Sequence, residues 1–161
     1  MPLPVDSRRR LPAAALAAAL LGIGLPGARA GDTDDRPFDA GRARRHYLMF
    51  CQGCHEADAS GRNTVPPMRG QLGYFLGVDG GREFIARVPG VISNPMSDAD
   101  VAEVLNWVLD TFSARELPED FTPYTAAEIR ALRQTPLTDV KRERRRLIER
   151  LERQQPALSI Q

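Results

Sequence analysis

Cysteine and histidine are scarce in this chain of 161 residues, which contains only two of each. Both cysteines and one of the histidines fall within residues 50–55, FCQGCH. A disulfide between Cys51 and Cys54 would close a very small loop, and such loops add little entropic stabilisation. A structural zinc site needs about four ligands, and the chain offers only these two cysteines, His55 and His46. The scarcity therefore argues against both a structural disulfide and a structural zinc centre.

A second long apolar run and an excess of positive charge are also missing. The single apolar run, residues 11–25, is too short to span a bilayer comfortably. The chain has 22 basic and 21 acidic residues, so its net charge gives no indication of nucleic-acid binding. We therefore expect no nucleic-acid binding and a soluble mature protein.

Residues 1–30 have the composition of an export signal. Three arginines at residues 8–10 precede the apolar run, and the small residues Ala28 and Ala30 follow it. This order is typical of a secretory signal peptide, and an uncleaved membrane anchor is the alternative. We expect cleavage after Ala30, a flexible N-terminus over residues 31–37 and a periplasmic location. Cleavage would remove four arginines and one aspartate, leaving 18 basic and 20 acidic residues.

The two cysteines with an adjacent histidine fit a redox pair or a haem site. A thioredoxin-like CxxC needs a strand-to-helix junction, whereas residues 38–50 predict a helix with no buried strand nearby. The pattern CxxCH is that of a c-type haem attachment site. Thiols three residues apart lie on one face of a helical turn, where each can add to a vinyl group of one porphyrin. We therefore predict one covalent haem c on Cys51 and Cys54, with His55 as an axial iron ligand.

From about residue 38 to residue 112 the sequence resembles a small class I cytochrome c. Tyr47 matches the aromatic position of that family's N-terminal helix, and Trp107 matches the aromatic position of its C-terminal helix. Residues 64–67 match the turn whose proline carbonyl usually accepts a hydrogen bond from the proximal histidine. The resemblance implies an all-α, class I cytochrome c-like helical domain around one haem, and a protein that carries single electrons.

The pattern of the residues agrees with this fold. Ser97 and Asp100 fit a capping box. Apolar residues then recur at helical spacing, at Val101, Val104, Leu105, Val108, Leu109 and Phe112. A loop over residues 61–70 and a short helix from Gly81 to Arg87 precede this helix, and no β-sheet is expected. Four aromatic and aliphatic side chains are expected in the core or haem pocket: Tyr74, Phe75, Leu76 and Phe84.

The sixth iron ligand has several candidates in the sequence. The resemblance implies a methionine in the loop before the C-terminal helix, but residues 88–94 contain none. Met96 is the first candidate, although its place just before the helix cap also suits a hydrophobic staple with Val101. Met68 or an open site are the alternatives, whereas His46 fits a surface position.

The ligand set decides the class of function. Haem with His/Met ligation is an electron carrier with a raised reduction potential, whereas an open site can bind gases or react with peroxide. Once His55 is committed to iron, only His46 remains as an imidazole base, so we expect an electron carrier and no enzyme. A haem-based sensor or peroxidase-like protein is the alternative. The expected partners are redox proteins, such as a periplasmic dehydrogenase and a terminal oxidase or another cytochrome.

Residues 113–124 are predicted to be a linker and residues 125–161 a helical C-terminal extension. Thr125 and Glu128 form a second capping box, and residues 138–155 predict a longer helix. A thin apolar stripe runs along it, at Val140, Leu147, Ile148 and Leu151. Its other positions are mostly arginine and glutamate. We expect a solvated helix that lies on the domain, with a docking arm for an acidic partner or a membrane surface as the alternative.

Overall fold

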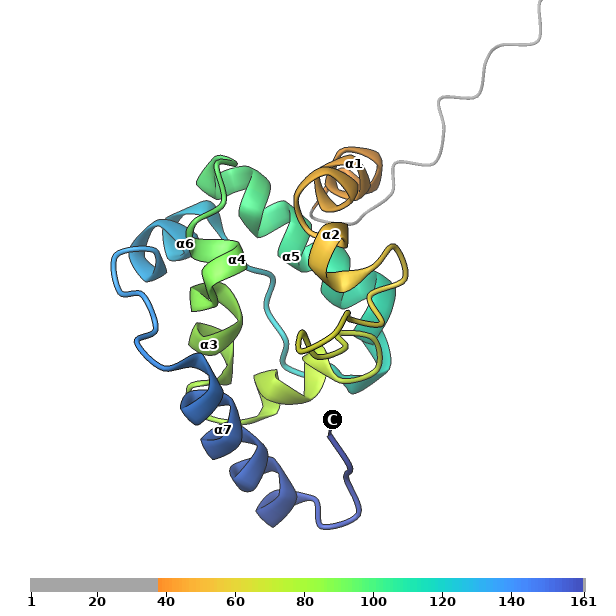
Figure 1. Ribbon diagram of the computed structural model, residues 1–161, viewed down its shortest axis with the longest axis vertical. Coiled ribbons are helices and arrows are strands. Elements are labelled where there is room, and N and C mark those ends of the chain that lie inside the picture. The colour runs from red at the N-terminus through yellow and green to blue at the C-terminus, as the bar shows by residue number, and fades with distance from the viewer. Residues whose placement is uncertain (1–37, 161) are drawn as a thin grey trace, which may run out of the picture. The chain divides into compact units, whose positions relative to one another are not determined.

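The computed structural model describes residues 38–160, so the expected signal peptide and residues 31–37 lie outside the described part of the chain. All regular elements of the described residues are helical, which confirms the predicted all-α class (Figure 1). They are α1 (Ala40–Phe50), α2 (Gln52–His55), η1 (Leu72–Gly77), α3 (Gly81–Arg87), α4 (Pro89–Ile92), α5 (Asp98–Ser113), η2 (Ala114–Glu116), α6 (Ala126–Leu132) and α7 (Val140–Gln154). Within residues 38–160, no helix is long and apolar enough to cross a membrane.

The two longest helices of the predicted domain begin at side-chain caps. The Asp39 carboxylate accepts a hydrogen bond from the Arg42 amide at 2.8 Å and starts α1. The hydroxyl of Ser97 accepts from the Asp100 amide at 3.1 Å and donates to the Asp100 carboxylate at 2.6 Å. The capping box predicted for α5 is therefore present, and it satisfies backbone donors that the first turn leaves unpaired.

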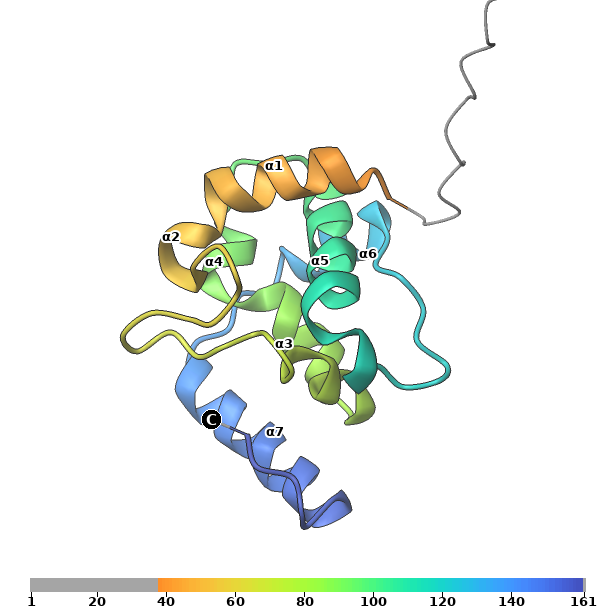
Figure 2. The same cartoon turned by 90° about the vertical axis from the view of Figure 1, so that its right-hand side faces the viewer.

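Helix α1 packs across α5 (Figure 2), and three aromatic rings fill the crossing. The ring of Tyr47 lies 5.3 Å from that of Trp107 and 5.6 Å from that of Phe112, measured between centroids. Trp107 and Phe112 meet edge to face at 5.4 Å. Tilted and edge-to-face pairs are favourable arrangements for aromatic rings, so these contacts fix where α1 crosses α5.

Helix α5 is buried on more than one face because α1 packs on one side of it and α6 on another. The apolar residues predicted along α5 are in the core, with Phe112 half-buried. Burial also extends to Asn106, whose side-chain amide donates to the Tyr124 carbonyl at 3.0 Å. The carbonyl oxygen of that amide accepts from the Tyr124 backbone at 2.8 Å. Helix α5 therefore holds the chain directly before α6.

The C-terminal helices contribute to the same hydrophobic core as the residues before 113. Ile129 of α6 and Leu147 and Leu151 of α7 are almost completely buried. The apolar stripe predicted for residues 138–155 thus faces protein. Arg150 adds a hydrogen bond to the Asp79 carbonyl at 2.6 Å and holds α7 to the turn before α3.

Two short elements differ from the sequence prediction. Residues 88–94 were expected to be a loop, but they contain the one-turn helix α4, which begins at Pro89. Proline suits the first position of a helix because its fixed φ is helical and it has no N–H to leave unpaired. The 3₁₀ helix η1 was not predicted either. The bounds expected for α3 agree with the structure.

Candidate haem-binding site

Cys51, Cys54 and His55 lie on a single tight turn. The amides of Cys54 and His55 both donate to the Cys51 carbonyl at 3.1 Å. Cys51 also ends α1, because its amide donates to the Tyr47 carbonyl at 2.8 Å. Both thiols are free, that of Cys51 half-buried and that of Cys54 exposed. The turn thus presents two thiols and one imidazole from five consecutive residues.

The surroundings of this turn set the protonation of its groups. Burial, and then the neighbouring Cys54, raises the pKa of the Cys51 thiol to about 11. Burial lowers the pKa of His55. At neutral pH, Cys51 is therefore a thiol and His55 a neutral imidazole, the form that binds metal ions.

The His55 ring nitrogen Nδ1 is buried and has no hydrogen-bond partner among the described residues. The bond to a proline carbonyl of residues 64–67, which the resemblance implied, is not present in this structure. Buried polar atoms without a partner are uncommon and often mark a functional group. Two free thiols and a half-buried, neutral imidazole whose Nδ1 has no partner fit a covalently bound haem.

The backbone reverses sharply after His55. Glu56 has φ 59° and ψ 166°, a conformation that residues other than glycine rarely adopt. Its carbonyl accepts a hydrogen bond of 2.7 Å from the hydroxyl of Tyr47, whose ring is buried. Burial raises the pKa of Tyr47 to about 12, so this hydroxyl stays a donor at neutral pH. Tyr47 therefore contacts both ends of the turn, through its carbonyl to the Cys51 amide and through its hydroxyl to the Glu56 carbonyl.

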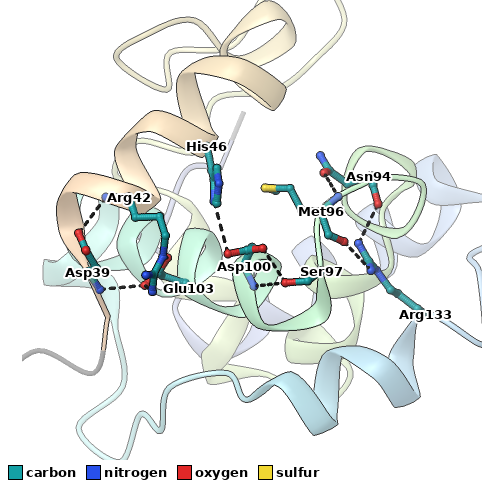
Figure 3. Close-up of polar contacts among 9 residues, drawn as sticks. All are labelled: Asp39, Arg42, His46, Asn94, Met96, Ser97, Asp100, Glu103 and Arg133. Carbon is teal, nitrogen blue, oxygen red and sulfur yellow. Dashed lines mark hydrogen bonds and ion pairs between the residues drawn. The ribbon is translucent and has the colours of Figure 1, made fainter.

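Met96 lies on a different segment, directly before α5. Its side chain is 9% exposed and belongs to the core. Its amide donates to the Asn94 side chain at 3.0 Å, and its carbonyl accepts from Arg133 at 3.0 Å (Figure 3). Arg133 also donates to the Asn94 carbonyl at 2.9 Å and to the Asp98 carboxylate at 2.8 Å. One arginine therefore holds the backbone on both sides of Met96.

The position of Met96 suits both of its predicted roles, as a packing residue and as a ligand. Val101, its expected staple partner, is buried in the same core, so burial alone suits both a packing role and a ligand role. Met68 is half-buried and packs against the core. Cys51, Cys54 and His55 share one turn, whereas Met96 comes from a separate part of the chain. Neither Asn94 nor Arg133 was singled out from the sequence.

A separate group of ionisable side chains connects α1 to α5. His46, Asp100 and Glu103 place ligand atoms within 4.8 Å of one another. The Glu103 carboxylate, however, already accepts from Arg42 Nε at 2.7 Å, from Arg42 Nη2 at 2.6 Å and from the Asp39 amide at 2.9 Å. The Arg42 guanidinium therefore balances the charge of the buried Glu103 carboxylate. The group is therefore an ion-paired contact between two helices, as Figure 3 shows.

Two curated proteins of similar sequence are both named cytochrome c-552, and both come from Thermus thermophilus. Each is 30% identical to this chain over 118 residues, a match that covers 60% of this chain. The match covers 90% of the first relative and 80% of the second. No protein-family model matches the chain.

Proposed function

Because this chain belongs to the class I c-type cytochromes, we propose that it carries single electrons on one covalent haem c in the periplasm. The observation that carries the proposal is the single turn with two free thiols and a half-buried, neutral imidazole. Cys51 and Cys54 would hold the haem through two thioether bonds, and His55 would be an axial ligand. Met96 is the proposed second axial ligand.

The bound haem supplies the one-electron couple between ferric and ferrous iron. The protein contributes a rigid frame for the ligands. Tyr47 fixes the backbone after His55, while Arg133 and Asn94 fix the backbone around Met96. Residues that orient a metal ligand also tune its metal. Side chains on segments held in this way would shift little between the two oxidation states of a bound haem, which would favour fast electron transfer.

The attachment is tested with the purified, exported protein on a denaturing gel stained for haem. The unmodified chain should retain haem after acid–organic extraction, because thioether bonds survive denaturation. Cys51→Ala combined with Cys54→Ala should abolish stable haem incorporation, whereas Met49→Ala, next to the motif, should leave the stain intact. An unmodified protein that contains no haem, or loses all of it in the extraction, would refute the proposal.

The second candidate function requires an iron whose distal site is open. It is considered because no methionine lies in residues 88–94 and Met96 also suits a packing role. The protein would then be a haem-based sensor or a peroxidase-like protein. Carbon monoxide decides between the two candidates. Ready binding to the ferrous unmodified protein would favour the sensor or peroxidase-like function, and resistance to binding would favour the electron carrier.

Redox proteins are the proposed partners, for example a periplasmic dehydrogenase as donor and a terminal oxidase or another cytochrome as acceptor. Among the described residues, the large apolar side chains that stay exposed are Met49 at 71% and Phe50 at 39%. Both directly precede Cys51, so a partner that packs on them would come close to the haem attachment. A membrane contact through α7 would have to be electrostatic, because Leu147 and Leu151 are buried in the core.

A further inference from the structure

A cavity of about 580 Å³ lies between the loop of residues 60–67 and the start of α7. The loop follows the haem-attachment turn directly, and its Gly61 amide donates to the His55 carbonyl at 3.2 Å. The opposite wall comes from Lys141, Arg144 and Arg145, far away in the sequence. Figure 2 shows the loop after α2 and the first turns of α7 on the same side of the molecule. The cavity therefore lies against the loop that follows the haem-attachment turn, and α7 of the C-terminal extension forms its opposite wall.

The lining of this cavity is positively charged. Its side chains include four cations, namely Arg62, Lys141, Arg144 and Arg145, and no aspartate or glutamate is among the described residues that line it. Arg62 forms an ion pair with Glu56, so most of the unbalanced positive charge in the lining comes from α7. Ser60, Asn63 and Thr64 add uncharged polar groups. Such a cavity favours carboxylate or phosphate groups.

Arg144 is the most enclosed of the three α7 cations that line the cavity. It is half-buried, and its guanidinium lies 5.8 Å from the centroid of the Phe75 ring. Burial lowers the pKa of Arg144, because desolvation disfavours its charged form. A carboxylate in the cavity would lie beside a partly desolvated guanidinium, where an opposite charge favours the charged form.

We propose that this cavity receives the propionate carboxylates of the haem and that Lys141, Arg144 and Arg145 are their cationic partners. The proposal rests on the proposed function, since it needs a haem attached at Cys51 and Cys54. The propionates are the ionised groups of the macrocycle, and carboxylates taken from water need charged or hydrogen-bonding partners. Helix α7 thereby completes the cofactor site of a domain whose family pattern ends at residue 112.

The test compares two double variants of the full-length, haem-loaded protein. Arg144→Gln with Arg145→Gln removes two charges from the cavity. Arg142→Gln with Arg146→Gln removes two charges from the same helix at positions that do not line the cavity. We expect the first variant to have a lower reduction potential than the unmodified protein, because nearby cations disfavour ferric haem. The control should retain a potential close to that of the unmodified protein.

The pH dependence of the potential gives a second readout. Cations beside a carboxylate lower its pKa, so removing them should move the propionate-linked step in potential to higher pH. The bands of the propionate groups in resonance Raman spectra should shift in the same variant. Neither change is expected in the control, and a change of equal size in both variants would overturn the proposal.

The remaining outcomes separate the possible sources of the carboxylate. If the potential and the Raman bands are unchanged, while electron transfer with an acidic protein partner loses its salt dependence, the cavity binds that partner and the proposal is wrong. If the unmodified protein contains no haem, the proposed function has failed instead. Should the double variant fold poorly, Arg145→Gln and Lys141→Gln alone suffice, because both side chains are exposed, and an unchanged potential in both would overturn the proposal.

Discussion

The two segments that carry the predicted iron ligands are built in different ways. His55 is held by its own neighbourhood, through the turn at Cys51 and the bond from Tyr47 to Glu56, nine residues away in sequence. Met96 is held mainly from a distance, because Arg133 lies 37 residues later in sequence. The first segment is a local motif, whereas the second depends on the C-terminal helices being folded in place. Changes to each segment should therefore have different consequences.

The largest effect should come from His55→Gly. This substitution removes the proposed axial ligand but leaves both thiols, so the haem should stay covalently attached while the low-spin visible spectrum is lost. Added imidazole should restore much of that spectrum by binding in the space left by the side chain. His46→Gly is the control and should keep the spectrum of the unmodified protein. Retention of the original spectrum in His55→Gly would show that another residue is the ligand.

The second largest effect on the haem spectrum should come from Met96→Ala. Loss of a ligand should open the iron to carbon monoxide, remove the methionine–iron charge-transfer band of the oxidised protein and lower its reduction potential. Loss of only a staple should reduce stability by about 1 kcal/mol, on the scale of helix-cap contacts, and leave the spectrum unchanged. Met68→Ala is the matched control. If the charge-transfer band disappears in Met68→Ala and not in Met96→Ala, Met68 is the ligand.

Arg133→Gln tests whether the C-terminal helices hold the Met96 segment. The variant loses hydrogen bonds to the carbonyls of Met96 and Asn94 and the ion pair with Asp98. We expect a loss of about 2–3 kcal/mol in the free energy of unfolding, because these are charge-assisted bonds of a side chain that is only 17% exposed. If Met96 is the ligand, its charge-transfer band should also weaken or shift.

Arg130→Gln is the control for this contact. Arg130 also pairs with Asp98, at 3.2 Å, but its side chain is 73% exposed. An exposed ion pair contributes at most about 1 kcal/mol, so this variant should remain close to the unmodified protein in chemical denaturation. Equal losses in both variants would mean that Arg133 acts only through Asp98 and does not hold Met96.

The helices were predicted where their caps and periodicity are strong. Ser97 begins α5 and Thr125 begins α6 as expected, since each hydroxyl accepts from the amide three residues later. The one-turn helix α4 was missed because four residues are too few to show a periodic pattern. The stripe of α7 indicated that one face is buried, but a stripe does not reveal its partner. The packing of α7 into the shared core could therefore not be derived from the sequence.

The candidate site shows the same limit. Cys51, Cys54 and His55 are adjacent in sequence, so their spacing alone indicated a haem. Arg133 was not identified because its role comes from tertiary packing, and an arginine on an amphipathic helix has no local pattern that marks it. The strained backbone at Glu56 was missed for a related reason, since a glycine is the usual sequence signal for such a conformation and none stands at that position.

The smallest effect should come from Glu56→Gly, which tests how firmly the local segment is held. A non-glycine residue in this conformation costs on the order of 1–3 kcal/mol. Glycine removes that strain, but it adds about 0.5–1 kcal/mol of backbone entropy to the unfolded chain and loses the exposed pair with Arg62. We expect a net stabilisation of up to about 1 kcal/mol with an unchanged visible spectrum. Glu56→Ala is the control, because it loses the same pair but keeps the strain, and it should be no more stable than the unmodified protein. If both variants lose stability equally in chemical denaturation, the Arg62 pair outweighs the backbone strain and the local segment is not strained in solution.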